Sequence, residues 1–324
     1  QASGLSLIAS RNLAGDVSGI LAAGELAQAV RASGGPTLLV DLGGALSPSE
    51  QAFEHRRQGS LTVDLMNRSG FAAWFLGGRD LAWSNQLTRF LRRTDFPVLA
   101  ANLHRPETGS HLFQVQPYTV IRAAGKRVGL IGLSGGTADV LSSDPVEAAR
   151  YYARLMASRA DLIIVASAAG PDADLAIAQV EGIDLVVGVD VTSRVLRTDG
   201  GWIVATEEEQ GVWGIDLTLA DGKITGAAAR RVTVFEVDPV VISQAFLGWT
   251  VNLEGEPVSL GTVIGRSDGG FRHALTSPLG YYVADVIRDA AQTDGALVGT
   301  NHFPDDFTEG DITVYDLFRA YSLP

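Results

Sequence analysis

Five short loops follow apolar runs of the sequence, and they hold the side chains whose types and spacing could do chemistry. They are residues 8–15, 39–46, 76–82, 165–170 and 187–192. A catalytic dinuclear site gathers several carboxylate, imidazole and amide ligands at strand ends, around two metals roughly 3.5–4 Å apart. Asn12 and Asp190 carry oxygen atoms that could contact a hard cation, but no histidine lies in these loops. Two oxygens do not make such a site, so we expect no bound metal and no cofactor.

Other residues could bind an ion, but each also has a simpler structural explanation. Arg79 could bind an anion, or it could pair with a carboxylate such as Asp80 or Asp190, and we expect the pairing because an unpaired buried charge is costly. Residues 207–209, a run of three glutamates, could bind calcium, but an exposed acidic loop is the expected form. His104 and His111 flank a loop and could bind a surface metal, although ordinary surface histidines are expected.

Strand and helix signals alternate over the first 235 residues and predict the scaffold that positions these loops. Apolar runs bounded by Gly, Asp or Pro predict strands at 5–9, 37–42, 72–76, 97–101, 128–133, 162–166 and 185–189. Helical spacing appears at 21–31, 51–59, 85–93, 145–158 and 172–179. A hairpin is expected over 117–133, and a meander over 202–206, 214–219 and 223–234. Alternation of this kind predicts parallel pairing inside a layered α/β domain.

The order and spacing of the five loops resemble the N-terminal domain of the 5′-nucleotidase family of dinuclear metallophosphoesterases. That family's loops read roughly LHTNDxHG, LxDxGDxxQG, ALGNHEFD, xSHxG and GGHxH. Two structural phrases match more closely: Pro117–Gly132 resembles PYTVIERDGKKVGVIG, and Gly214–Ile224 resembles GRLDLTFDGKV. The resemblance implies a metallophosphoesterase-like β-sandwich flanked by helices over 1–235. It also implies a linker helix within 236–258 and a small, partial α/β C-terminal domain over 259–324.

The same resemblance implies which residues occupy the family's metal and catalytic positions. The positions that depart from the family's ligands are Asn12, Ala14, Gly44, Gly78, Arg79, Ala82, Ala168, Asp190 and Thr192. The metal-bridging aspartate of the family falls on Gly44, and its transition-state histidine falls on Arg79. We therefore expect a degenerate member of the family, with no catalytic residues and with Arg79 as a possible anion-binding residue.

Composition narrows the possible partners and the compartment. The chain has 324 residues, 46% of them hydrophobic, a net charge of −12 and no cysteine. An acidic surface repels nucleic-acid phosphates, so nucleic acid is not an expected partner, and no apolar run reaches the length of a membrane-spanning helix. The first residue is Gln1 rather than Met, which favours a processed chain that is periplasmic or extracellular.

Three functions remain open from the sequence. The expected one is an exported pseudoenzyme that serves as a structural or binding subunit of a larger assembly, with a protein partner reached through the C-terminal unit. The first alternative is a metal-dependent hydrolase of nucleotides or related phosphate esters with a rearranged site. The second is a binding protein for a small anion, held by Arg79 and by backbone N–H groups at the strand ends.

Overall fold

The chain is described by a computed structural model that divides it into two units. The described residues are 3–46, 60–82, 84–135, 137, 140–190, 194–232, 250–253, 256–269, 281, 284–286, 288–289, 292–295 and 309–316. Unit 1 comprises Gln1–Pro48 and Gly59–Glu236, and unit 2 comprises Ser49–Gln58 and Val237–Pro324. The helix predicted at 51–59 and residues 236–249 of the predicted linker helix lie outside the described residues, whereas residues 250–253 and 256–258 of that linker range are strands and not helix.

Unit 1 contains a first sheet of six strands in the order β14-β13-β1-β2-β3-β4. The bounds are β1 (Ser3–Arg11), β2 (Thr37–Asp41), β3 (Ala73–Phe75), β4 (Val98–Leu99), β13 (Gly211–Ala220) and β14 (Lys223–Val232). Strands β1 to β4 run parallel, whereas β13 is antiparallel to both β1 and β14. The parallel strands therefore bring the loops that follow them to one edge of the sheet.

A second six-stranded sheet has the order β11-β12-β10-β9-β7-β6. The bounds are β6 (Tyr118–Ala123), β7 (Lys126–Leu133), β9 (Leu162–Ser167), β10 (Leu185–Asp190), β11 (Arg194–Arg197) and β12 (Trp202–Glu207). Strands β7, β9, β10 and β12 are parallel, with the antiparallel strands β6 and β11 at the two edges. A separate short pair joins β5 (Leu103–His104) to β8 (Leu141–Ser142).

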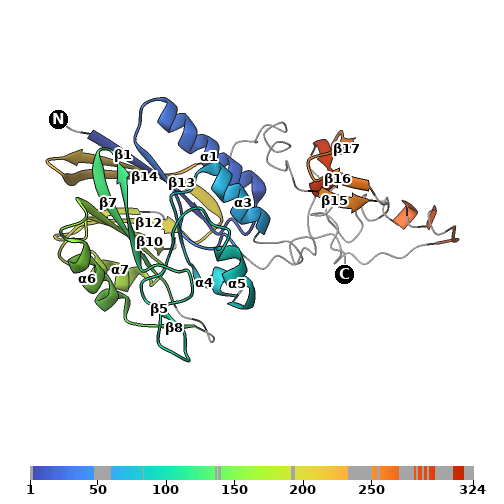
Figure 1. Ribbon diagram of the computed structural model, residues 1–324. Helices are drawn as coiled ribbons and strands as arrows, with labels where there is room; N and C mark the ends of the chain where they lie inside the picture. The colour runs from blue at the N-terminus through green and yellow to red at the C-terminus, as the bar shows by residue number, and fades with distance from the viewer. Residues whose placement is uncertain are drawn as a thin grey trace. The chain divides into compact units, whose positions relative to one another are not determined.

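The described helices of unit 1 are α1 (Val17–Ala32), α3 (Ser60–Ser69), α4 (Gly78–Leu81), α5 (Ser84–Leu91), α6 (Pro145–Met156) and α7 (Pro171–Ile177). Helices α1 and α3 lie together beside the first sheet, and α6 and α7 lie on the second (Figure 1). Asp16 caps α1, and Asp144 caps α6 ahead of Pro145, as the Asp-Pro pair predicts.

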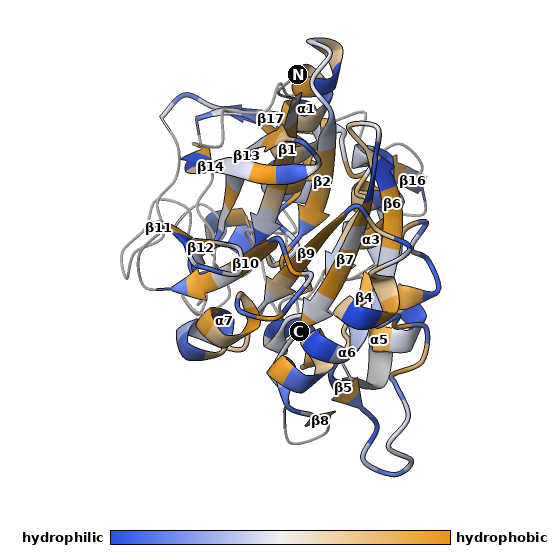
Figure 2. Ribbon diagram, turned by 90° about the vertical axis from the view of Figure 1, so that its left-hand side faces the viewer, coloured by the Kyte–Doolittle hydropathy of each residue, from blue (hydrophilic) through white to orange (hydrophobic). Residues whose placement is uncertain are grey.

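The main core lies between the two sheets. Leu5 and Leu7 of β1 and Leu217 of β13 pack there in one cluster with Leu130 of β7 and Ile164 of β9. A second cluster fills the space between the other face of the second sheet and helices α6 and α7. Figure 2 shows strands β2, β7 and β9 coloured as hydrophobic for most of their length. The predicted layered α/β sandwich is confirmed.

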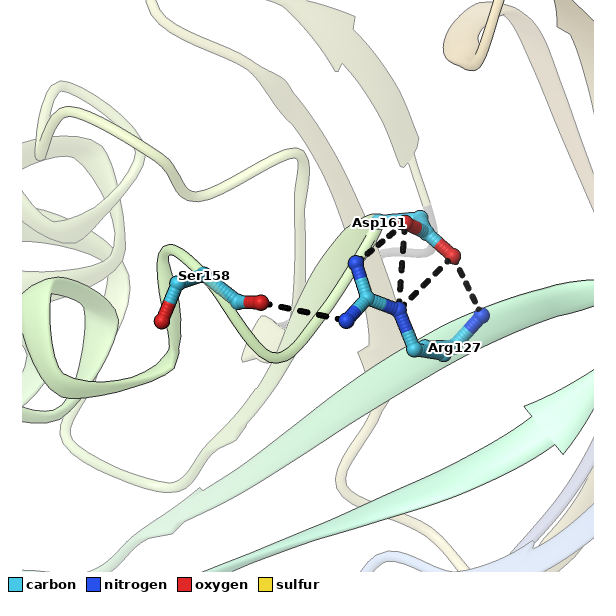
Figure 3. Close-up of polar contacts among 3 residues, drawn as sticks. All are labelled: Arg127, Ser158 and Asp161. Carbon is cyan, nitrogen blue, oxygen red and sulfur yellow. Dashed lines mark hydrogen bonds and ion pairs between the residues drawn. The ribbon is translucent and has the colours of Figure 1, made fainter.

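An exposed ion pair ties the start of β7 to the start of β9. Arg127 donates from its guanidinium and from its backbone N–H to the carboxylate of Asp161, at 2.8 Å in each case for the shortest contacts. The same guanidinium donates to the carbonyl of Ser158, 3.1 Å away (Figure 3). The hydrogen bonds from Arg127 lower the pKa of Asp161 to about 2.

Unit 2 is described only in short pieces. Strands β15 (Thr250–Leu253) and β16 (Glu256–Ser259) form an antiparallel pair, and β17 (Val263–Ser267) pairs antiparallel with β18 (Gly310–Thr313). Among the described residues of the whole chain, none of the helices is long and apolar enough to cross a membrane.

Candidate functional site

A cavity of about 760 Å³ lies where the five predicted loops meet. Its lining comes from the ends of β1, β2, β3, β9 and β10 and from the turn after β12. Six of the positions singled out by the family resemblance line it, namely Asn12, Gly44, Gly78, Arg79, Ala168 and Asp190. The fold thus brings together residues that are far apart in the sequence.

Two further positions do not contribute to that lining, and a third lies outside the described residues. Ala14 follows β1 with a positive φ of 52°, and its N–H donates to the carbonyl of Gly44 at 2.9 Å. Ala82 is exposed at the end of α4, where its N–H donates to the carbonyl of Arg79. Thr192 lies outside the described residues.

The position given to the metal-bridging aspartate has no room for a side chain. Gly44 adopts a φ of +80°, which L-residues with a Cβ rarely accept. A Cβ at this position would collide with Oδ1 of Asn12 and would lie 2.9 Å from the Cα of Asn12. The amide of Asn12 is itself held in place, because its Nδ2 donates to the carbonyl of Glu208. Asn12 and Gly44 therefore fit one another as a pair.

A buried arginine lies beside these two residues. Arg11, the last residue of β1, is 4% exposed, and its Nε donates to Oγ1 of Thr206 at 3.0 Å. Burial lowers the pKa of Arg11 to about 10, while Asp41, Asp174 and Glu208 act against that shift. The guanidinium therefore stays charged at neutral pH. Its Nη2 is buried and has no hydrogen-bond partner among the described residues.

Sequence reasoning missed Arg11, although strand alternation carried the signal. Leu5, Leu7 and Ala9 point into the core between the sheets, and side chains two residues apart in a strand share a face. Arg11 continues that series by one step. Strand alternation alone could therefore have identified Arg11, rather than Arg79, as the positively charged residue that points toward the core.

Two buried carboxylates accept hydrogen bonds from the loops that line the cavity. Asp41, at the end of β2, accepts from the hydroxyl of Ser10 at 2.6 Å and from the N–H of Gly43 at 2.8 Å. Burial raises the pKa of Asp41 to about 7, and the charge of Asp80 adds to that rise. Asp80 is fully buried, and burial likewise raises its pKa, to about 6.

Asp80 connects two loops through hydrogen bonds to their backbones. Its carboxylate accepts backbone N–H groups from Gly44 at 2.8 Å, Leu46 at 2.9 Å and Gly77 at 2.9 Å. The indole of Trp74 lies 3.4 Å from the same carboxylate. The lone pairs of Asp80 are thus directed at the protein itself, and the residue holds the loops after β2 and β3 together.

The expected pairing of Arg79 with Asp80 or Asp190 is wrong. Asp80 is taken up by backbone donors, and Asp190 pairs with Arg194 at 2.7 Å. Arg79 is exposed, lines the cavity and makes no ion pair with any residue that the structure describes. Because Arg79 is not buried, leaving it unpaired costs little.

Polar groups at this site that could contact a metal already bind other groups of the protein. The described part of the chain contains no group of three or more His, Cys, Asp or Glu side chains that could hold a metal ion. The amide of Asn12 and the carboxylate of Asp190 already bind other groups of the protein. Arg11 adds a fixed positive charge near Asp41, Asp174 and Glu208, and that charge disfavours the binding of a cation there.

Comparison with known proteins relates the chain to one family, although no protein-family model matches it. A 5′-nucleotidase-type protein of Treponema pallidum is 31% identical over 196 residues, which cover 56% of this chain and 32% of that protein. The NAD 5′-nucleotidase of Haemophilus influenzae is 31% identical over 145 residues, covering 41% of this chain and 24% of that protein. The chain therefore matches a third or less of the length of these relatives.

Solved structures show the same fold at lower sequence identity. A 5′-nucleotidase precursor from Thermus thermophilus superposes with a TM-score of 0.64 and 19% identity, covering 98% of this chain and 73% of that one. A calcineurin-like phosphoesterase from Bacillus subtilis gives 0.62 and 17% identity, covering 76% of this chain and 97% of that one. The chain is thus similar in sequence, over part of its length, to 5′-nucleotidases, and it shares their fold and that of a calcineurin-like phosphoesterase.

Proposed function

We propose that this chain is a catalytically inactive 5′-nucleotidase-like protein, exported and serving as a structural or binding subunit of a larger assembly. The observation that carries the proposal is the fit of Asn12 against Gly44. The backbone of Gly44 and the amide of Asn12 fill the place where a bridging carboxylate would extend toward two metals. Without that carboxylate a dinuclear centre loses the ligand that both metals share.

The buried guanidinium of Arg11 supports the same proposal. A metallophosphoesterase balances the carboxylates of its site with metal cations, whereas here a covalently fixed cation lies near Asp41 and Asp174. An internal charge of this kind keeps the scaffold intact when no metal is bound. The guanidinium of Arg11 supplies neither a Lewis acid nor an activated water, so it stabilises the fold without supporting hydrolysis.

The metal-dependent hydrolase finds no support in the donor set, but the anion-binding protein has one observation in its favour. Arg79 is exposed on the cavity wall and unpaired within the described chain, beside the backbone of Gly77 and Gly78. Four acidic residues on the same lining oppose it, namely Asp190, Glu207, Glu208 and Glu209. A rise in melting temperature with phosphate or sulfate that is lost in Arg79→Ala would favour this second function.

Catalytic inactivity is tested by metal content and hydrolysis measured on the same untagged preparation. Elemental analysis after native purification without chelators is expected to find no dinuclear complement of Zn, Mn, Fe or Ca. Added metals are expected to give no hydrolysis of nucleoside monophosphates, NAD or thiosulfate esters. Two equivalents of metal per chain together with metal-dependent turnover would overturn the proposal.

The assembly role is tested by the native mass of the exported protein. If the chain serves as a subunit, material from the periplasm or culture medium should elute well above its own 34.2 kDa, together with a partner in fixed ratio. Our proposal places that partner on the C-terminal unit, so a chain ending after Glu236 should elute as a free monomer. A full-length chain that runs as a monomer in its native extract would contradict the role.

A further inference from the structure

Two histidines face each other across a short hairpin in unit 1. His104 ends β5, and an isolated antiparallel bridge pairs it with His111. The N–H of Arg105 donates to the carbonyl of Ser110 at 2.8 Å and closes the loop between them. Directly opposed residues of an antiparallel pair put their side chains on one face. The imidazole centroids accordingly lie 5.0 Å apart, with an interplanar angle of 31°.

The outer nitrogen of each ring is held by a hydroxyl group. Nε2 of His104 lies 3.2 Å from Oγ of Ser143, and that hydroxyl donates to the carbonyl of Asn102 at 3.5 Å. The Ser143 oxygen is therefore free to accept the Nε2–H of His104. Nε2 of His111 lies 3.0 Å from the hydroxyl of Tyr152, which can rotate to accept in the same way. In the tautomer in which both hydroxyls accept, the proton lies on Nε2 and a lone pair lies on Nδ1 of each ring.

The Nδ1 nitrogens of the two rings have no hydrogen-bond partner in the described chain. Nδ1 of His104 and Nδ1 of His111 are both buried and make no hydrogen bond to any described residue. Buried polar atoms without a protein partner are rare, and a bound ion or water is one of the few explanations for them.

The spacing of the rings matches a shared metal ion. With metal–nitrogen bonds of about 2.0–2.1 Å and a tetrahedral angle at the metal, the centroids of two ligating imidazoles lie roughly 5 Å apart. Metal-bound histidines also characteristically donate their other ring N–H to a nearby acceptor. Ser143 and Tyr152 supply those acceptors here.

We propose that Nδ1 of His104 and Nδ1 of His111 form a binding site for one divalent transition-metal ion. Imidazole ligands suit Cu²⁺, Ni²⁺ and Zn²⁺, and Cu²⁺ binds tightest in the general order of affinities. Because no third His, Cys, Asp or Glu joins the pair in the described chain, the proposal leaves the remaining coordination positions to water. None of His104, His111, Ser143 and Tyr152 lines the main cavity, so the site does not rest on the proposed function.

The test is a titration of the full, untagged chain with CuCl₂ and, separately, with ZnCl₂. Calorimetry is expected to show one equivalent of Cu²⁺ bound more tightly than Zn²⁺. His104→Asn and His111→Asn are each expected to weaken Cu²⁺ binding at least about tenfold. Tyr152→Phe removes the hydroxyl partner of His111 but no ligand, and about a tenfold loss is expected there too.

A matched control separates this pair from the other histidines. The triple variant His55→Asn, His273→Asn, His302→Asn leaves His104 and His111 in place and should bind Cu²⁺ as the unaltered chain does. Unchanged binding in the double variant His104→Asn, His111→Asn, or lost binding in the triple variant, would overturn the site. Electron paramagnetic resonance of the Cu²⁺-loaded unaltered chain needs no variant to fold. It should show two imidazole nitrogens on the copper, and a spectrum with one or none would equally overturn the site.

Discussion

At the scale of single residues, the space available in the site depends on how the side chain of Asn12 packs against the backbone of Gly44. A family-like aspartate at position 44 would need the space that the Asn12 side chain fills and a φ other than +80°. Gly78, by contrast, has nothing within 4 Å of the place where its Cβ would be, and it is exposed. Two glycines on the same cavity wall therefore differ sharply in their tolerance of a side chain.

This difference predicts the outcome of restoring family residues one at a time. Gly44→Asp should lower the free energy of unfolding by at least about 2 kcal/mol, because it adds backbone strain and a clash with Asn12. Gly78→Asn should stay within about 0.5 kcal/mol of the unaltered chain. Urea unfolding followed by circular dichroism measures both, and equal effects of the two substitutions would show that the Asn12–Gly44 fit is unimportant.

Arg11 predicts a second contrast between two arginines of the same cavity. Arg11→Met leaves the carboxylates of Asp41 and Asp174 without the buried guanidinium beside them. The substitution should lower the free energy of unfolding by about 3 kcal/mol at pH 8. Arg79→Met removes an exposed charge without an ion pair in the described chain and should change stability by less than about 0.5 kcal/mol. Denaturation midpoints of the two variants at one pH give the comparison. Were Arg79→Met the more damaging, the assignment of the structural cation to Arg11 would fall.

At the scale of elements, regular segments with strong local signals were predictable from the sequence. The predicted hairpin over 117–133 appears as β6 and β7, and Asp144-Pro145 starts α6 as expected. Helix α3 was missed because its apolar residues are mixed with polar ones along Ser60–Ser69, which leaves no clear helical stripe. Strand β11 was missed because all four of its residues are exposed, so it carries no burial pattern.

The polar contacts of the site were less predictable, since they depend on which loops meet. The sequence marks Asp41 and Asp80 as loop residues at a distance of 39 positions, and only the parallel register of β2 and β3 brings them together. The partners of Asp80 are backbone N–H groups, which no residue type reveals. The pairing of Arg79 was predicted wrongly for the same reason.

These loop carboxylates predict that stability falls as the pH rises. The pKa of Asp41 is raised to about 7 and that of Asp80 to about 6, above the value near 3.9 of an unfolded aspartate. The folded state therefore binds more protons between pH 4 and 7, so this contribution is complete below pH 4 and is lost as the pH passes 6 and 7.

From pH 5 to pH 8 the free energy of unfolding, measured with urea, should fall by about 4 kcal/mol. Asp41→Asn cannot ionise, so its unfolding free energy should depend less on pH over the same range. Equal slopes for the two proteins would mean that Asp41 titrates normally in the folded state.

At the scale of the whole molecule, both hydrophobic clusters belong to unit 1. Their buried members run from Leu5 to Ile224, and all twelve strands of the two large sheets lie before residue 233. Since each sheet finds its strand partners inside this range, the strand pairing of the scaffold uses no strand of unit 2 among the described residues. The binding role proposed for the C-terminal unit is then physically separable from the stability of the scaffold.

Truncation after Glu236 tests that separation. The shortened chain should unfold in one cooperative thermal transition, because it keeps both six-stranded sheets and both clusters. Its melting temperature should lie within about 4 °C of the main transition of the full chain, which corresponds to a change of roughly 1 kcal/mol for a domain of this size. Calorimetry of both chains, with near-ultraviolet circular dichroism as a check on tertiary packing, gives the measurement. A truncated chain without a cooperative transition would mean that residues after 236 complete the core, and the C-terminal unit would then be part of the scaffold and not an independent binding element.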